Sequence, residues 1–181
     1  ADYARKGIAR GRAAVASTFR DGVLLCAENP SNTLRKLSEI YDRIGFMGVG
    51  KYNEFDQLRI AGVRHADLKG YSYSRDDVDA RWLANQYAQI LGQYFTHEMK
   101  PLEVEILIAE MSIEPGDDRL FHLLYDGTVM DTTTHVVIGG EADVIRERLE
   151  ASWSDGDELD AAVAVAVQAL AGPDRALVPD D

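Results

Sequence analysis

Residues 22–59 read GVLLCAENPSNTLRKLSEIYDRIGFMGVGKYNEFDQLR and place one lysine, Lys36, between two predicted apolar strands that lead into a helix. A lysine is almost never fully buried unless it is paired. Lys36 should therefore either meet a carboxylate or open onto a groove where a negative group can bind. The plain alternative is a lysine on the solvent face of an alternating strand.

Composition indicates one ordinary globular domain: 181 residues, 46% hydrophobic and 28% charged, with a formal net charge of −12. That charge argues against nucleic acid as a partner, because phosphate binding needs clustered lysine and arginine. The sequence contains neither a run of roughly 18 to 20 apolar residues nor a signal-peptide pattern, so we expect no membrane partner and a cytoplasmic location. Basic residues crowd the first twenty positions, which suits a segment that contacts another protein.

Strands and helices are predicted in the order strands, two helices, strands, two helices. Because the helices arrive in consecutive pairs, the order favours antiparallel sheets covered by helix pairs over a doubly wound parallel sheet. The expected class is α+β, a four-layered helix–sheet–sheet–helix sandwich. The predicted strands are 13–19, 23–28, 34–40, 44–49, 104–111, 120–125, 128–130 and 135–138, and the predicted helices are 51–69, 76–99, 141–152 and 157–171.

Local signals support two of these boundaries. Asp21 and Gly22 predict the turn of a hairpin between the first two strands. Ser74, with Asp77 three residues later, predicts the N-cap of the second helix.

Residues that could carry catalysis or hold a metal are sparse. The four histidines, His65, His97, His122 and His135, show no metal-ligand spacing, and the sequence has no GxSxG motif. The single cysteine, Cys26, falls within an apolar strand, where a small core residue is the favoured interpretation. We therefore expect no catalytic residue, no metal and no cofactor.

Several segments taken together resemble the alpha-type subunit of the proteasome, in its bacterial, actinobacterial-type branch. The segments cover most of the chain in order, so the resemblance is specific. They are DYARKGIARG at 2–11, DGVLLCAENPS at 21–31, LRKLSEIYDRIGFMGVGKYNEFDQLR at 34–59, KGYSYSRDDV at 69–78, LANQYAQ at 83–89 and YDGTVMD at 125–131.

This resemblance implies the four-layered sandwich of N-terminal-nucleophile hydrolases. It also implies a homo-heptameric outer ring that caps proteolytic beta rings, gates the entry of unfolded protein and receives a ring-shaped ATPase activator. The whole chain, 1–181, would be a single subunit domain, with 1–11 as the remnant of an initial helix and basic entry segment. Relative to the family, both ends of the sequence look truncated.

The same resemblance implies a non-catalytic chain. In catalytic beta subunits the nucleophile is an amino-terminal threonine, and the aligned place here is occupied by Arg12. Glu28 and Lys36 fall where beta subunits keep an acidic residue and their active-site lysine. A stand-alone N-terminal-nucleophile hydrolase, or a homomeric proteasome-like peptidase, is the alternative that Arg12 disfavours, and a monomeric acidic interaction domain is a third.

Site residues are also implied by the resemblance. Lys36, with Arg5, Gly50 and Lys51, would line a pocket between ring neighbours where the C-terminal carboxylate of an activator docks. The alternative is a structural Lys36 paired with Glu39 or Glu28. Residues expected at subunit interfaces are Tyr3, in the last turn of the initial helix, and Trp82, Tyr87 and Tyr94 of the second long helix.

Overall fold

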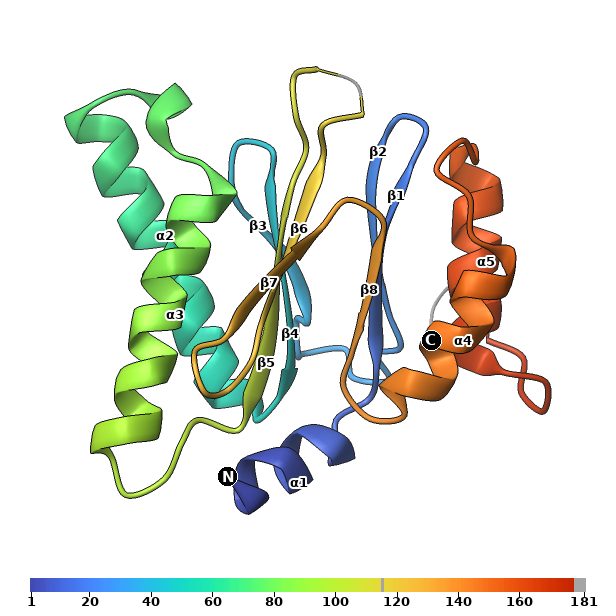
Figure 1. Ribbon diagram of the computed structural model, residues 1–181, viewed down its shortest axis with the longest axis horizontal. Coiled ribbons are helices and arrows are strands. Elements are labelled where there is room, and N and C mark those ends of the chain that lie inside the picture. The colour runs from blue at the N-terminus through green and yellow to red at the C-terminus, as the bar shows by residue number, and fades with distance from the viewer. Residues whose placement is uncertain (115, 178–181) are drawn as a thin grey trace.

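Two antiparallel sheets lie face to face, and each carries a pair of helices on its outer side (Figure 1). The computed structural model describes residues 1–114 and 116–177. Within them the strands are β1 (Ala14–Phe19), β2 (Gly22–Ala27), β3 (Leu37–Tyr41), β4 (Ile44–Gly50), β5 (Val104–Glu110), β6 (Arg119–Leu123), β7 (Val129–Thr132) and β8 (His135–Ile138). The α-helices are α1 (Asp2–Arg10), α2 (Tyr52–Ser72), α3 (Ala80–His97), α4 (Ala142–Ser152) and α5 (Leu159–Ala171).

The sheets differ in size. One has three strands in the order β2-β1-β8, and the other has five in the order β3-β4-β5-β6-β7. Neighbours in each sheet pair antiparallel, and β1 occupies the centre of the small sheet between β2 and β8. The α+β class expected from the order of elements is thereby confirmed.

Apolar side chains fill three separate spaces between the layers. The largest cluster lies between the five-stranded sheet and helices α2 and α3, around Phe46, Tyr87 and Phe121. A second cluster, which includes Met47 and Leu107, lies between the two sheets. A third packs the three-stranded sheet against α4 and α5. Strands β1, β4 and β5 therefore bury residues on both of their faces, whereas β3 and β7 keep exposed residues such as Glu39 and Met130.

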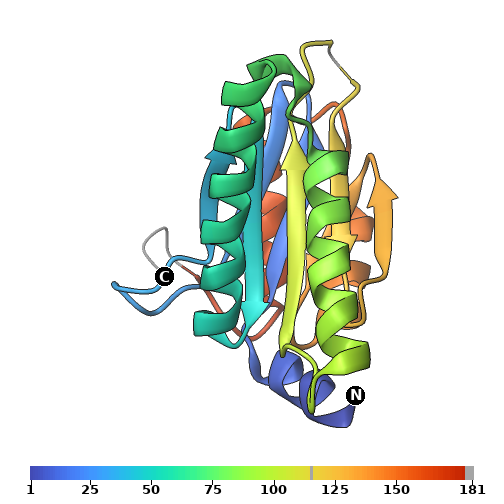
Figure 2. The same cartoon turned by 90° about the vertical axis from the view of Figure 1, so that its left-hand side faces the viewer.

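Helix α1 lies across one end of the sandwich, below β4 and β5 in Figure 1, and Figure 2 shows it beneath the five-stranded sheet. Ala4 and Ile8 are its buried residues, one turn apart on the same face. Tyr3 was expected in the last turn of this helix. It lies in the first turn instead, because the helix continues to Arg10.

Several predicted boundaries were wrong in an informative way. The third strand begins at Leu37, not 34, so Lys36 lies just before the strand rather than within it. Ser74 caps only a short 3-10 turn, and Asp79 caps the long helix, because its carboxylate accepts a hydrogen bond of 2.7 Å from the Trp82 amide. The first hairpin turns at Arg20 and Asp21, since Gly22 already pairs with Phe19.

Within the residues that the structure describes, no helix combines the length and apolarity needed to cross a membrane.

Candidate functional site

Lys36 lies at the end of the sandwich near α1, where it enters β3. Its ammonium donates hydrogen bonds to the main-chain oxygens of Arg12, at 3.0 Å, and Glu28, at 3.3 Å. Partial burial lowers the pKa of the Lys36 ammonium, and the nearby Arg12 guanidinium lowers it further, while Glu28 opposes both effects. An ammonium has three N–H donors, so one remains beyond these two contacts.

Neither of the carboxylates proposed as structural partners binds Lys36. Among the described residues the Glu28 carboxylate pairs with Arg12 and Arg175, and Lys36 reaches only the Glu28 carbonyl. Glu39 lies on the exposed side of β3 and forms no ion pair within residues 1–114 and 116–177. Within the described residues, the structural alternative in which Lys36 pairs with the carboxylate of Glu39 or Glu28 is therefore not found.

Glu28 is the centre of an ion-pair cluster at the end of β2. Arg175 binds its two oxygens in bidentate fashion, with both N–O distances at 3.0 Å, and the Arg12 guanidinium contacts one of the same oxygens. The hydrogen bonds from Arg175 hold the pKa of the Glu28 carboxyl below its usual range, and the charges of both arginines act in the same direction. Glu28 is thus kept ionised between two cations.

Gly50 and Lys51 form the corner from β4 into α2, close to the end of α1. Gly50 has a left-handed backbone, with φ of +105°, and a Cβ atom there would lie 2.1 Å from the Glu103 oxygen, so only glycine fits. A Cβ on Gly11 would lie 3.1 Å from the Gly50 nitrogen. The structure therefore brings this corner next to Gly11, the residue that precedes Arg12, whose carbonyl binds Lys36.

The side chains of Lys51 and Arg5 point to other partners in this single chain. The Lys51 ammonium is 3.6 Å from Glu54 and remains partly exposed. Arg5 donates a 3.0 Å hydrogen bond to the hydroxyl of Tyr125, which lies on the loop after β6. Lys36 and the Gly50–Lys51 corner are thus neighbours, while Arg5, near the middle of α1, is held by Tyr125.

Of the four aromatic residues expected at interfaces, Tyr87 is misplaced. It is only 2% exposed, and its hydroxyl donates to the Leu58 oxygen at 2.7 Å, because α3 turns this face toward the five-stranded sheet. Burial raises the pKa of that hydroxyl. Trp82 is half-buried and carries the Lys69 ammonium 4.2 Å above its ring. Tyr3 and Tyr94 are exposed.

Two features of this end could not have been found by inspecting local sequence. Arg175 reaches Glu28 from 147 residues away. The sequence shows no metal-ligand spacing around His122, but its Nε2 lies 2.5 Å from Glu105, and the other Glu105 oxygen accepts from the Gly139 amide at 3.4 Å. The sequence shows the charges of these residues but not which of them meet in the fold. The described residues contain no group of three or more His, Cys, Asp or Glu side chains suited to a metal ion.

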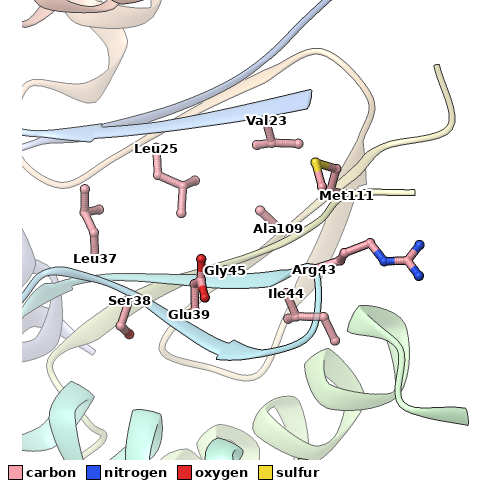
Figure 3. Close-up of a pocket in the computed structure, with 10 residues that line it drawn as sticks. All are labelled: Val23, Leu25, Leu37, Ser38, Glu39, Arg43, Ile44, Gly45, Ala109 and Met111. Atoms are coloured by element: carbon pink, nitrogen blue, oxygen red, sulfur yellow. The ribbon is translucent and has the colours of Figure 1, made fainter. Parts of the chain in front are cut away.

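The opposite end of β2 has a different character. There the two sheets separate around a cleft of about 600 Å³, walled by Val23 and Leu25 on one side and by Gly45, Ala109 and Met111 on the other. Figure 3 shows Val23 and Leu25 facing Ala109 and Met111 across the gap, with Arg43 and Ile44 pointing away from it. No charged cluster like that at Glu28 lines this cleft.

The fold is an α+β sandwich of two antiparallel sheets, and Arg12 at its charged end is ion-paired with Glu28. Residues 8–173 match the family model described as proteasome subunit. Three bacterial proteins named proteasome subunit alpha are similar to the chain. The one from Acidimicrobium ferrooxidans is 59% identical over all of this chain and 78% of its own length. Those from Sanguibacter keddieii and Streptosporangium roseum are 54% and 53% identical, over 96% of this chain and 68% and 67% of their lengths.

The chain therefore belongs to the proteasome subunit family, as a non-catalytic alpha-type subunit of the 20S core particle. The resemblance inferred from its sequence segments is confirmed at this level.

Proposed function

We propose that the chain forms the outer, homo-heptameric ring of a cytoplasmic bacterial 20S proteasome, built on the N-terminal-nucleophile hydrolase fold as one subunit domain. This ring gates the entry of unfolded protein, rests on beta rings that hold the catalytic threonines, and receives a ring-shaped ATPase through its C-terminal tails. The observation that carries the proposal is the environment of the Lys36 ammonium. It is a half-buried ammonium with a lowered pKa, two carbonyl contacts and one N–H to spare.

A carboxylate is the ligand that this ammonium would favour. Carbonyl oxygens offset only part of the cost of burying a positive charge, whereas a carboxylate supplies a full opposite charge and an acceptor. The nearby corner at Gly50 keeps the main chain free of side-chain bulk, which suits the close approach of a peptide end. Arg5 of α1 and Lys51 complete the proposed pocket, with a ring neighbour as its other wall.

Interfaces are assigned to exposed aromatic residues. Tyr3 on α1 fits contacts between alpha neighbours, and Tyr94 on α3, with the half-buried Trp82 of the same helix, fits contacts with the beta ring. Tyr87 is removed from this set because it is a core residue. The alternative of a stand-alone hydrolase finds no support, since the Arg12 guanidinium is held by Glu28 at the place where the threonine would stand.

Affinity for tail peptides tests the pocket. A peptide that copies the C-terminal tail of a candidate ring ATPase should bind the assembled particle, and the same peptide with an amidated C-terminus should bind far more weakly. Lys36→Met, which keeps the aliphatic stem, should weaken the free-acid peptide by about one to two orders of magnitude, because a charge-assisted contact contributes roughly 1.5 to 3 kcal/mol.

Lys100→Met, at an exposed lysine beyond α3, is the matched control and should bind as the wild type does. Thermal stability and ring assembly of both variants must be measured alongside. If Lys36→Met assembles fully and binds the peptide with unchanged affinity, Lys36 does not receive a carboxylate. If it instead fails to assemble, its two carbonyl contacts are its main role.

A further inference from the structure

A second cavity lies on the other side of the Arg12–Glu28 pair from Lys36. It has a volume of about 410 Å³ and is enclosed by the end of α1, the starts of β1 and α4, and the end of α5. Its charged lining consists of Arg10, Arg12, Arg148 and Arg175, together with Glu28 and Glu141. Four guanidinium groups and two carboxylates give this cavity a positive charge in a chain whose net charge is −12.

The two carboxylates do not satisfy the four guanidinium groups. Glu28 is shared by Arg12 and Arg175, and Arg175 also donates hydrogen bonds to the oxygens of Leu170 and Ala171. Arg148 donates one hydrogen bond, of 2.8 Å, to the Ala169 oxygen, and neither it nor Arg10 forms an ion pair within residues 1–114 and 116–177. Three of the arginines therefore keep N–H groups that can face a ligand.

Backbone constraints hold this arrangement in place. Glu141 adopts a left-handed conformation, with φ of 59°, directly after the two glycines that end β8. Such a conformation is costly for a residue with a side chain and is typical of sites that the surrounding structure fixes. A Cβ atom on Gly140 would lie 2.5 Å from the Ala9 oxygen, so the loop can pack against α1 only with glycine at this position.

We propose that this cavity binds a small polyvalent oxyanion, a phosphate or carboxylate compound large enough to contact Arg10, Arg12 and Arg148 together. Converging guanidinium groups repel one another unless an anion lies between them, and their planar donor pairs match the oxygens of phosphate and carboxylate groups. The cavity is comparable in volume to ordinary small-ligand sites; Arg10 and Arg12 are exposed and Arg148 is half-buried. Lys36 is not part of its wall, but it binds the main-chain oxygens of Arg12 and Glu28, so this site lies next to the proposed tail pocket.

Calorimetric titration of the purified full-length protein, in the oligomeric state in which it is isolated, tests this site. Pyrophosphate and citrate are the two probes, each at constant ionic strength, so that the experiment distinguishes phosphate from carboxylate ligands. Binding of either probe supports the site. Binding of neither at millimolar concentration overturns it.

Variants locate the binding. Arg148→Gln and Arg10→Gln should each weaken the bound probe by about tenfold or more, and Glu141→Gln should strengthen it severalfold, because it removes a negative charge from the wall. Arg146→Gln is the matched control, since Arg146 lies on the same helix but pairs with Asp143 on the exposed surface. Its affinity should equal that of the wild type.

Arg148 also ties α4 to α5, so the Arg148→Gln variant could lose stability for structural reasons. Arg10 is exposed and makes no such contact within the described residues. A loss of affinity in Arg10→Gln therefore reports on probe binding and not on a structural defect. Equal loss of affinity in Arg10→Gln and Arg146→Gln would show that only the general surface charge attracts the probe, and this result would overturn the proposal.

Discussion

The two ends of strand β2 lie in different surroundings, one apolar and one charged, although residues 23–27 are all partly buried. At the Gly22 end, the sheets open into a cleft walled by alternating apolar side chains of β2, β4 and β5. At the Glu28 end, charged groups from positions 12, 28, 36 and 175 converge. The first end follows directly from strand alternation, whereas the second requires segments that are distant in sequence to meet. The difference places the proposed binding function at the charged end.

The packed middle between these ends should be by far the most sensitive region. Leu107 is fully buried between the sheets, so Leu107→Ala should lower the free energy of unfolding by about 2–5 kcal/mol. Met111→Ala, at the open apolar cleft, should cost much less, because Met111 is already 42% exposed. Urea unfolding of both variants measures the contrast. Equal losses would mean that the cleft is closed in solution.

The charged end should show an intermediate effect. Glu28→Gln leaves Arg12, Arg175 and Lys36 without their shared negative charge, and we expect a loss of about 1–2 kcal/mol, between the values typical of exposed and buried ion pairs. Glu158→Gln, at the exposed partner of Arg20, is the control and should change stability by less than about 0.5 kcal/mol. A Glu28 variant as stable as this control would show that the cluster contributes nothing to folding.

Lowering the pH should remove the stabilisation that the ionised Glu28 carboxylate gives the folded chain. The pKa of Glu28 is lower in the folded chain than in the unfolded chain, so its stabilisation is fully present above the ordinary glutamate pKa of about 4.3 and is lost as pH falls through the lowered value. The difference in unfolding free energy between wild type and Glu28→Gln should therefore shrink below about pH 4. A difference that stays constant down to pH 2 would contradict this assignment.

Sequence patterns predicted the order of strands and helices along the chain, with the helices in pairs, because buried strands and helical stripes are local signals. His135–Ile138 was predicted without error, and most other strand boundaries moved by one or two residues. Tyr87 was misassigned because a helix with many large apolar residues does not reveal which of them face the sheet. The sequence analysis named Arg12, Glu28 and Lys36 of this cluster but not Arg175, since no local pattern links Arg175 to a glutamate 147 residues away.

The smallest effect on folding is expected on the outer surface of α3, away from both ends of β2. Tyr94 is 40% exposed, so Tyr94→Asp should change the stability of the isolated chain by less than about 0.5 kcal/mol. At an interface the same change buries an unpaired charge, and we expect weaker assembly with beta subunits. Sedimentation of the mixture checks this, with Gln93→Asp on the adjacent exposed position as the control. Wild-type sedimentation of Tyr94→Asp would place the beta ring elsewhere.

The most direct test of the non-catalytic assignment is hydrolysis of fluorogenic peptides by the purified full-length chain, alone and mixed with beta subunits. Because the family resemblance aligns Arg12, which pairs with Glu28, with the catalytic threonine of beta subunits, the chain alone should show no turnover. The mixture should hydrolyse the peptides, and a covalent inhibitor directed at threonine should stop it by modifying only the beta subunits. Turnover by the chain alone that this inhibitor abolishes would contradict the assignment.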